Sequence, residues 1–197
     1  MPRPSVREKL LSAGMQVLWK QGYADGGVRD IVALAGARPG SFTNHFASKE
    51  EFAEQVLERY GAMVEGLIEK ILSDENVPAP RRLKRYLDFI TDRLGNAHWA
   101  RGCMAGNLSL EMANSSERLR EKLEEIFRKW GALFARCIAE GQAKGEIAGD
   151  FTADELADFL ISGWQGAMLR MKVARNPEPL ERFKKVVFAT VFERGQS

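Results

Sequence analysis

The sequence predicts an all-α protein of about nine helices, on three observations. Every long segment repeats its apolar residues at intervals of three and four, which is the periodicity of one helix face. No segment alternates apolar and polar residues as a half-buried strand does. Pairs with capping-box spacing, a Ser, Thr or Asn with Glu three positions later, precede three of the periodic segments.

The composition is that of an ordinary globular chain. Of the 197 residues, 45% are hydrophobic and 28% are charged, which suffices for a buried core and argues against disorder. The two cysteines have no CxxC spacing, and no apolar run approaches the roughly 18 residues of a membrane span. We therefore expect reduced thiols, no membrane segment and a cytoplasmic location.

Two short helices are predicted before residue 37. Residues 6–17 place apolar side chains along one face, and Gly22 is a natural end for this first helix. Residues 28–35 carry Val, Ile, Val and Ala at i, i+3, i+4 and i+7, a stripe of about two turns. Gly36 then ends the second helix, because glycine adopts a left-handed conformation without a Cβ penalty.

Residues 39–46 are predicted to form a third helix with one apolar side. Pro39 suits a first helical turn, and Phe42 and Phe46, spaced i, i+4, are its only large apolar residues. The other residues are small, polar or basic, so the helix would be anchored on one side and would expose hydrogen-bonding groups on the other. Reading base edges in a major groove requires such a face.

The predicted DNA-facing residues lie in and beside this third helix. Arg38 suits either a guanine edge or a phosphate, and Asn44 suits either an adenine edge or the DNA backbone. Arg29 and Lys49 stand at helix starts and are predicted phosphate contacts, which fix the register without reading sequence. The full predicted set is Arg29, Arg38, Pro39, Gly40, Ser41, Thr43, Asn44, His45 and Lys49.

The later helices follow from caps and periodicity. A Ser48–Glu51 capping box begins a long helix that reaches about Leu72, and residues 73–80 are the clearest break in the chain. The predicted domains are residues 1–52 and 53–197, with the long helix belonging to both parts. Further helices are predicted near 83–94, 102–112, 117–145, 155–171 and 180–191, two of them behind the pairs Asn114–Glu117 and Thr152–Glu155.

Positive charge gathers at the start of the chain. The net charge is only +2, but the first 49 residues hold seven basic and three acidic residues, a net +4 against −2 for the remainder. Because phosphates attract Lys and Arg, the favourable charge lies where the third helix is predicted.

The most specific sequence segments are VRDIVALAG, from Val28 to Gly36, and GSFTNHFASKEE, from Gly40 to Glu51. With them, residues 6–52 resemble the N-terminal part of the TetR family of bacterial transcriptional regulators. Residues 101–113 and 130–147 are more loosely similar to C-terminal domains of that family. The resemblance implies an N-terminal helix-turn-helix DNA-binding domain and a C-terminal helical bundle for ligand binding and dimerisation. Many relatives carry Tyr where this chain has Thr43, so its operator preference is expected to be its own.

A homodimeric, ligand-responsive repressor is the function that the resemblance implies. Its partners would be a double-stranded DNA operator with an inverted repeat, a small-molecule effector and a second copy of the chain, without membrane or cofactor. Effector binding would favour a C-terminal arrangement in which the long helix moves apart the two N-terminal DNA-binding domains, here called the heads. Release then requires that the effector bind the DNA-incompetent state better.

The effector pocket is expected in the middle of the C-terminal bundle. Asn107 and Glu111 are spaced i, i+4 on an otherwise apolar helix, so they point the same way and need partners if that face is buried. For the apolar candidates, packing in the core is the alternative. The predicted pocket residues are Trp99, Cys103, Met104, Asn107, Glu111, Phe127, Trp130, Phe134, Trp164 and Met168. The last two helices are expected to form the dimer interface through Phe159, Gly163, Trp164, Ala167, Leu180, Phe183 and Val187.

Three alternatives stay open. Cys103 follows Gly102 near a helix start and beside Arg101, an environment that suits a redox- or electrophile-sensing cysteine, although an inert buried thiol has the same sequence signature. Cys137 lies in a core stripe. An all-α enzyme and a ligand carrier without DNA binding are the other classes. The sequence shows no nucleophile–base pair, metal cluster or phosphate loop, so we expect neither catalysis nor a metal site.

Overall fold

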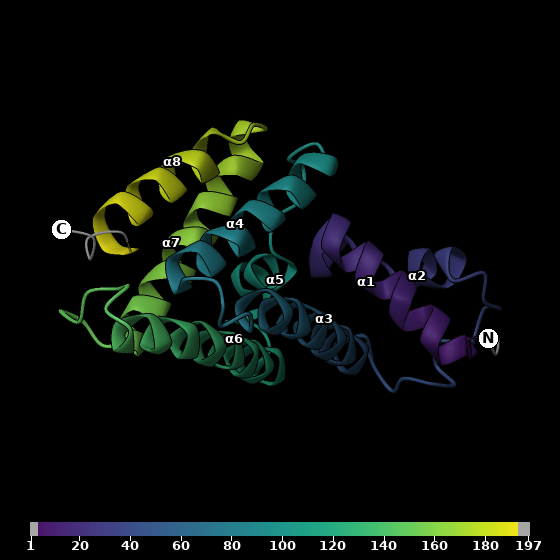
Figure 1. The fold of residues 1–197 in the computed structure, drawn as a ribbon. Helices are drawn as coiled ribbons and strands as arrows, with labels where there is room; N and C mark the ends of the chain where they lie inside the picture. The colour runs from purple at the N-terminus through teal and green to yellow at the C-terminus, as the bar shows by residue number, and fades with distance from the viewer. Residues whose placement is uncertain (1–3, 193–197) are drawn as a thin grey trace. The chain divides into compact units, whose positions relative to one another are not determined.

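The computed structural model describes residues 4–192, and these residues are all-α, as predicted (Figure 1). They form eight α-helices and a closing π-helical turn. The helices are α1 (Val6–Asp25), α2 (Val28–Leu34), α3 (Lys49–Leu72), α4 (Ala79–Asn96), α5 (Met104–Met112), α6 (Glu117–Ala143), α7 (Ala153–Ala174) and α8 (Glu178–Val187), followed by the π-helical turn Phe188–Phe192. No described helix combines the length and the apolar character that a bilayer crossing needs.

The predicted third helix was wrong, because residues 39–45 fold as consecutive turns. Gly40 has a φ of 87°, outside the right-handed helical region, so a regular helix cannot run through it. Helical hydrogen bonds survive only locally. The amide of Asn44 donates to the carbonyl of Gly40 at 3.3 Å, and the amide of Phe46 donates to that of Phe42 at 2.9 Å.

Side-chain caps set the starts of α3 and α7. Thr152–Glu155 forms the predicted capping box in front of α7. In front of α3, Ser48 accepts the amide of Glu51 at 3.0 Å, as predicted. The Glu51 carboxylate binds the amide of Ala47 at 2.9 Å, one residue before the expected partner. Both helices therefore begin with a satisfied amide.

The chain packs as two compact units. Among the described residues, the first combines residues 4–63 with Cys103–Ile126, and the second combines Val64–Gly102 with residues 127–192. Because α3 and α6 each run through a unit border, each helix contributes to both units. The predicted domain division at residue 52 does not coincide with this packing.

Within the first unit, α1 packs against α2 and α5 (Figure 1). Of the predicted apolar stripe on α1, Leu10, Ala13, Gly14 and Val17 are buried, whereas Val6 is exposed. Leu11 and Leu18 are buried as well. This helix is therefore the centre of the first core, and α5 belongs to that core although it is distant in sequence.

Within the second unit, α7 packs against α8, and α8 also contacts α4. Gly163 permits the first contact, because a Cβ there would lie 2.4 Å from the ring of Phe183. The buried Lys184 reaches Asp88 with 2.7 Å between Nζ and Oδ1. Burial raises the pKa of the Asp88 carboxyl, but hydrogen bonds from Lys184 and Lys84 outweigh it and hold the pKa below its ordinary value.

Candidate nucleic-acid interface

Residues 38–46, here called the reading segment, have an inner and an outer face. Phe42 and Phe46 are buried, with 5% and 2% of their surface exposed. The predicted division into apolar anchors and polar groups therefore holds without a regular helix. The polar face consists of the half-buried Ser41 and the exposed Arg38, Pro39, Gly40, Thr43, Asn44 and His45.

Three phenylalanine rings anchor the reading segment. Phe52, on the second turn of α3 and fully buried, has its ring centroid 4.9 Å from that of Phe42 and 4.7 Å from that of Phe46. Gly14 on α1 admits this ring, because a Cβ at Gly14 would lie 2.2 Å from it. The aromatic cluster of Phe42, Phe46 and Phe52 thus fixes the reading segment to both α1 and α3.

The helix before the reading segment ends where the sequence predicts. Gly36 has a φ of 58°, the left-handed conformation that glycine supplies at a helix end. Ile31 holds α2 in the core and is fully buried. Arg29 on α2 and Arg38 are exposed, and neither has an acidic partner among the described residues. Their charges therefore face solvent and are available to phosphates or base edges.

Lys49 differs from its predicted role as a phosphate contact. Its ammonium donates to the carbonyl oxygen of Tyr23 at 2.6 Å and lies 4.6 Å from the centroid of the Tyr23 ring. The lysine is thus bound within the protein, at the last turn of α1. Burial, followed by the nearby Glu50, raises the pKa of the Tyr23 hydroxyl.

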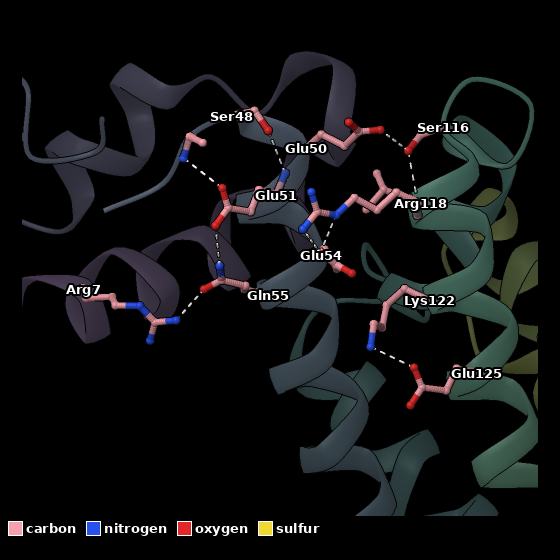
Figure 2. Close-up of polar contacts among 12 residues, drawn as sticks. Arg7, Ser48, Glu50, Glu51, Glu54, Gln55, Ser116, Arg118, Lys122 and Glu125 are labelled. Atoms are coloured by element: carbon pink, nitrogen blue, oxygen red, sulfur yellow. Dashed lines mark hydrogen bonds and ion pairs between the residues drawn. The ribbon is translucent and has the colours of Figure 1, made fainter. Parts of the chain in front are cut away.

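A polar network connects α1 to the start of α3 (Figure 2). The guanidinium of Arg7 donates to Gln55, and the Gln55 amide donates to Glu51 at 3.0 Å. Glu51 in turn binds the backbone in front of α3. The first turns of α3, which follow the reading segment directly, are therefore fixed from the side of α1.

A second network connects α3 to the start of α6 (Figure 2). Ser116 donates its hydroxyl hydrogen bond to Glu50 and accepts the amide of Leu119 at 3.1 Å, and Arg118 pairs with Glu54. The predicted Asn114–Glu117 capping box was wrong, since Ser116 is the cap of α6. These pairs join residues more than 60 positions apart, and no local sequence pattern reveals them.

Glu111 has its partners within the protein, so its carboxylate needs no ligand to satisfy it. One carboxylate oxygen, Oε2, accepts the amides of Tyr23 at 2.7 Å and of Ala24 at 3.1 Å. The residue is exposed, whereas Asn107 is half-buried. The predicted pair is therefore divided, and Glu111 leaves the set of pocket candidates.

The two cysteines are free and buried. The hydroxyl of Tyr60 donates to the sulfur of Cys103 at 3.6 Å and accepts the amide of Met104 at 3.3 Å. Burial raises the pKa of the Cys137 thiol to about 11, which keeps it protonated and inert at neutral pH, in line with its predicted core position.

The aromatic pocket candidates of the second unit pack on neighbouring rings. Phe134 meets Tyr86 with 5.2 Å between centroids, and Phe127 meets Trp130 at 5.5 Å. Such edge-to-face contacts are typical of core packing, which was the alternative to a pocket role for these residues. Trp99 is half-buried against Gly95. The buried candidates in this unit are Trp130, Phe134, Trp164 and Met168.

The predicted interface residues on α7 and α8 divide into two groups. Trp164, Ala167, Leu180 and Val187 are buried within the single chain, and the ring of Phe183 packs against Trp164 at 5.9 Å. Phe159 is exposed. Leu169 and Val173, which were not among the predicted interface residues, are also exposed, because α7 is apolar on more than one side. Their common face on α7, here called the outer stripe, comprises Phe159, Ser162, Gly166, Leu169 and Val173.

Comparison with known proteins places this geometry among regulators. A family model described as "Bacterial regulatory proteins, tetR family" matches residues 10–56. A second, described as "Tetracyclin repressor-like, C-terminal domain", matches residues 79–187. The chain is similar to the HTH-type transcriptional repressor DhaR of Mycobacterium sp. (strain GP1), with 45% identity over 188 residues that cover 95% of this chain and 93% of that protein.

Two solved structures are similar over nearly the whole chain. The regulatory protein TetR from Rhodobacter sphaeroides has a TM-score of 0.89 and 29% identity, covering 94% of this chain and 98% of its own. The TetR family regulator CifR, in a cysteine mutant solved with 26-bp double-strand operator DNA, has a TM-score of 0.77 and 26% identity, covering 96% and 97%.

Proposed function

Because the chain belongs to the TetR family and is a helix-turn-helix transcriptional repressor rather than an enzyme, we propose that it acts as a cytoplasmic homodimer on an inverted-repeat operator. A small-molecule effector then releases the dimer from the operator. A repressor works where the bacterial chromosome lies, which supports the cytoplasm as its location. Double-stranded DNA is the partner that the helix-turn-helix domain of this family binds.

The reading segment is the observation that carries the proposal. It exposes Arg38, Thr43, Asn44 and His45 on a backbone that three buried phenylalanine rings hold in place. Donors and acceptors on a fixed backbone suit readout of base edges, while the exposed Arg29 supports phosphate binding. A solvated surface without function needs no such anchoring. The proposed DNA-facing set is the predicted one without Lys49.

Selection of genomic fragments by the purified full-length protein, at two salt concentrations, tests this function. We expect one inverted repeat to be enriched, with enrichment that survives the higher salt better than bulk DNA does. Genes beside that repeat then narrow the choice of effector. Salt-labile binding to all fragments without an enriched site contradicts sequence-specific regulation by this head.

The outer stripe supports the homodimer. Its residues are small or apolar and exposed, and Val173 shows 80% of its surface to solvent in the single chain. Helices that meet through small residues such as Ser162 and Gly166 approach closely, and Phe159, Leu169 and Val173 supply apolar area to bury. The residues already buried in the chain's own core drop out of the proposed interface.

Replacing Val173 with Glu is expected to turn the dimer into a monomer. The substitution adds two carboxylates per dimer to an apolar contact, while in the monomer it alters an exposed position at little cost. Sedimentation velocity measures the change, and operator affinity should fall by about 100-fold or more because the two heads are no longer linked. The matched control is Leu110→Glu, on the exposed face of α5, which should remain dimeric. A dimeric Val173→Glu variant would place the interface elsewhere.

The proposed effector site lies within the second unit, among its half-buried and buried candidates. These are Trp99, Phe127, Trp130, Phe134, Trp164 and Met168, whereas Cys103, Met104 and Asn107 belong to the first unit. Aromatic rings suit a largely apolar molecule. Its identity follows from the genes that the operator search identifies.

Cysteine-based sensing through Cys103 is the second proposed mechanism, favoured by the hydrogen bond that Tyr60 donates to its sulfur. That contact gives the sulfur a fixed orientation beside a hydroxyl. A Cys103→Ala variant that still leaves operator DNA on oxidant treatment would exclude this mechanism and leave reversible effector binding.

A further inference from the structure

The last turn of α1 has an unusual backbone. Gly22 adopts φ 82° and ψ −174° inside α1, so the helix is interrupted there. The amides of Tyr23 and Ala24 directly follow this interruption and need partners outside the regular helical pattern. The second helix of the head begins only four residues after Ala24, at Val28.

Glu111 supplies those partners from α5. Its Oε2 accepts both amides, at 2.7 Å from Tyr23 and 3.1 Å from Ala24, across 88 and 87 residues of sequence. A carboxylate that accepts two backbone N–H groups makes charge-assisted hydrogen bonds, which are stronger than neutral ones. The approach is close, since a Cβ on Gly22 would lie 2.2 Å from Oε1 of Glu111. Glycine is therefore required there by contact as well as by its positive φ.

The same two residues are bound from the other side. The ammonium of Lys49, the first residue of α3, donates to the carbonyl of Tyr23 at 2.6 Å, with the carbonyl of Ala24 at 3.4 Å. The donors of this turn are thus held by α5 and its acceptors by α3. All of these groups lie in the first compact unit.

We propose that Glu111 is a positioning residue for DNA binding. Its carboxylate fixes the turn from which α2 and the reading segment depart, and so sets their orientation on the operator. The inference rests on the proposed function and deepens its regulation. α5 lies in the part of the chain that the C-terminal domain model matches, so an effector that binds better when α5 is displaced would release this turn.

Substitutions at Glu111 distinguish the effect of side-chain length from the effect of charge. Gln keeps an oxygen at the same distance and loses only the charge assistance, so Glu111→Gln should bind the operator no more than about threefold more weakly than wild type. Asp keeps the charge but is one methylene shorter, so Glu111→Asp and Glu111→Ala should each bind about tenfold more weakly, as expected for losing hydrogen bonds to a charged group. Wild-type affinity in the Asp variant with weak binding in the Gln variant would overturn the proposal.

The control removes the same charge elsewhere. Glu121→Ala changes an exposed carboxylate of α6 that makes no hydrogen bond or ion pair among the described residues. Loss of a carboxylate makes the protein more positive, which favours DNA by long-range attraction, so this variant should bind as tightly as wild type or more tightly. Weaker binding by Glu111→Ala therefore opposes the electrostatic trend.

Amide hydrogen exchange in the free, full-length protein gives a readout that needs no operator. Exchange at Tyr23 and Ala24 should become faster in the Ala and Asp variants and remain near wild type in the Gln variant. Unchanged exchange, or unchanged operator affinity in Glu111→Ala, overturns the inference while the repressor function stands. If wild type selects no operator, the proposed function fails, and faster exchange at this turn would not rescue a role for Glu111 in DNA binding.

Discussion

Replacing Phe52 with Ala is expected to lower the free energy of unfolding by about 3–5 kcal/mol, the usual cost of emptying a buried phenylalanine site. The side chain of Phe52 is completely buried, and its ring lies against those of Phe42 and Phe46. The cavity would leave both anchors of the reading segment without a partner. Since whole domains are stable by only about 5–15 kcal/mol, such a loss approaches the total.

Urea unfolding at fixed protein concentration, followed by circular dichroism, measures the change, because dimer stability depends on concentration. The control is Phe151→Ala, at a side chain with 62% of its surface exposed, which should change the free energy of unfolding by less than about 0.5 kcal/mol. Equal midpoints for the two variants would show that the aromatic cluster is not a core of the head.

Local patterns predicted most of the fold. The helices follow from apolar residues at three- and four-residue spacing, which depends only on helix geometry. The end of α2 at Gly36 and the box in front of α7 were predicted because each depends on residues within a few positions. The reading segment shows the limit of such patterns. Its apolar spacing is helical, but the backbone of Gly40 leaves the helical region, and periodicity carries no information about that choice.

Contacts between distant residues were not predictable from the sequence. Lys49 stands at a helix start, where a lysine suits a phosphate, yet a carbonyl 26 residues earlier binds its ammonium. Glu111 has the spacing of a pocket residue, yet backbone amides 88 and 87 residues away bind it. A sequence shows which polar groups need hydrogen-bond partners, but it does not show which distant residues the fold places beside them. On α7, two faces are apolar, so the sequence does not show which of them is buried in the chain's own core.

Replacing Arg38 with Ala is expected to abolish selection of the operator without unfolding the head. Arg38 is exposed at the start of the reading segment and has no acidic partner among the described residues, so its loss costs the fold little. A guanidinium contact to a base contributes about 1–3 kcal/mol, and the proposed dimer has two of them. Operator affinity should therefore fall by roughly 30- to 20,000-fold, which fluorescence anisotropy with a labelled duplex measures.

Arg29→Ala distinguishes base reading from phosphate binding. Both substitutions remove one positive charge from an exposed position of the head, but Arg29 is proposed to contact phosphate alone. Its loss should weaken binding to all duplexes alike and reduce the salt dependence by about one ion per protomer. Loss of Arg38 should also relax the preference at one base pair of each half-site. If Arg38→Ala lowers affinity equally for operator and unrelated DNA, Arg38 binds phosphate, and sequence is read by Thr43, Asn44 and His45.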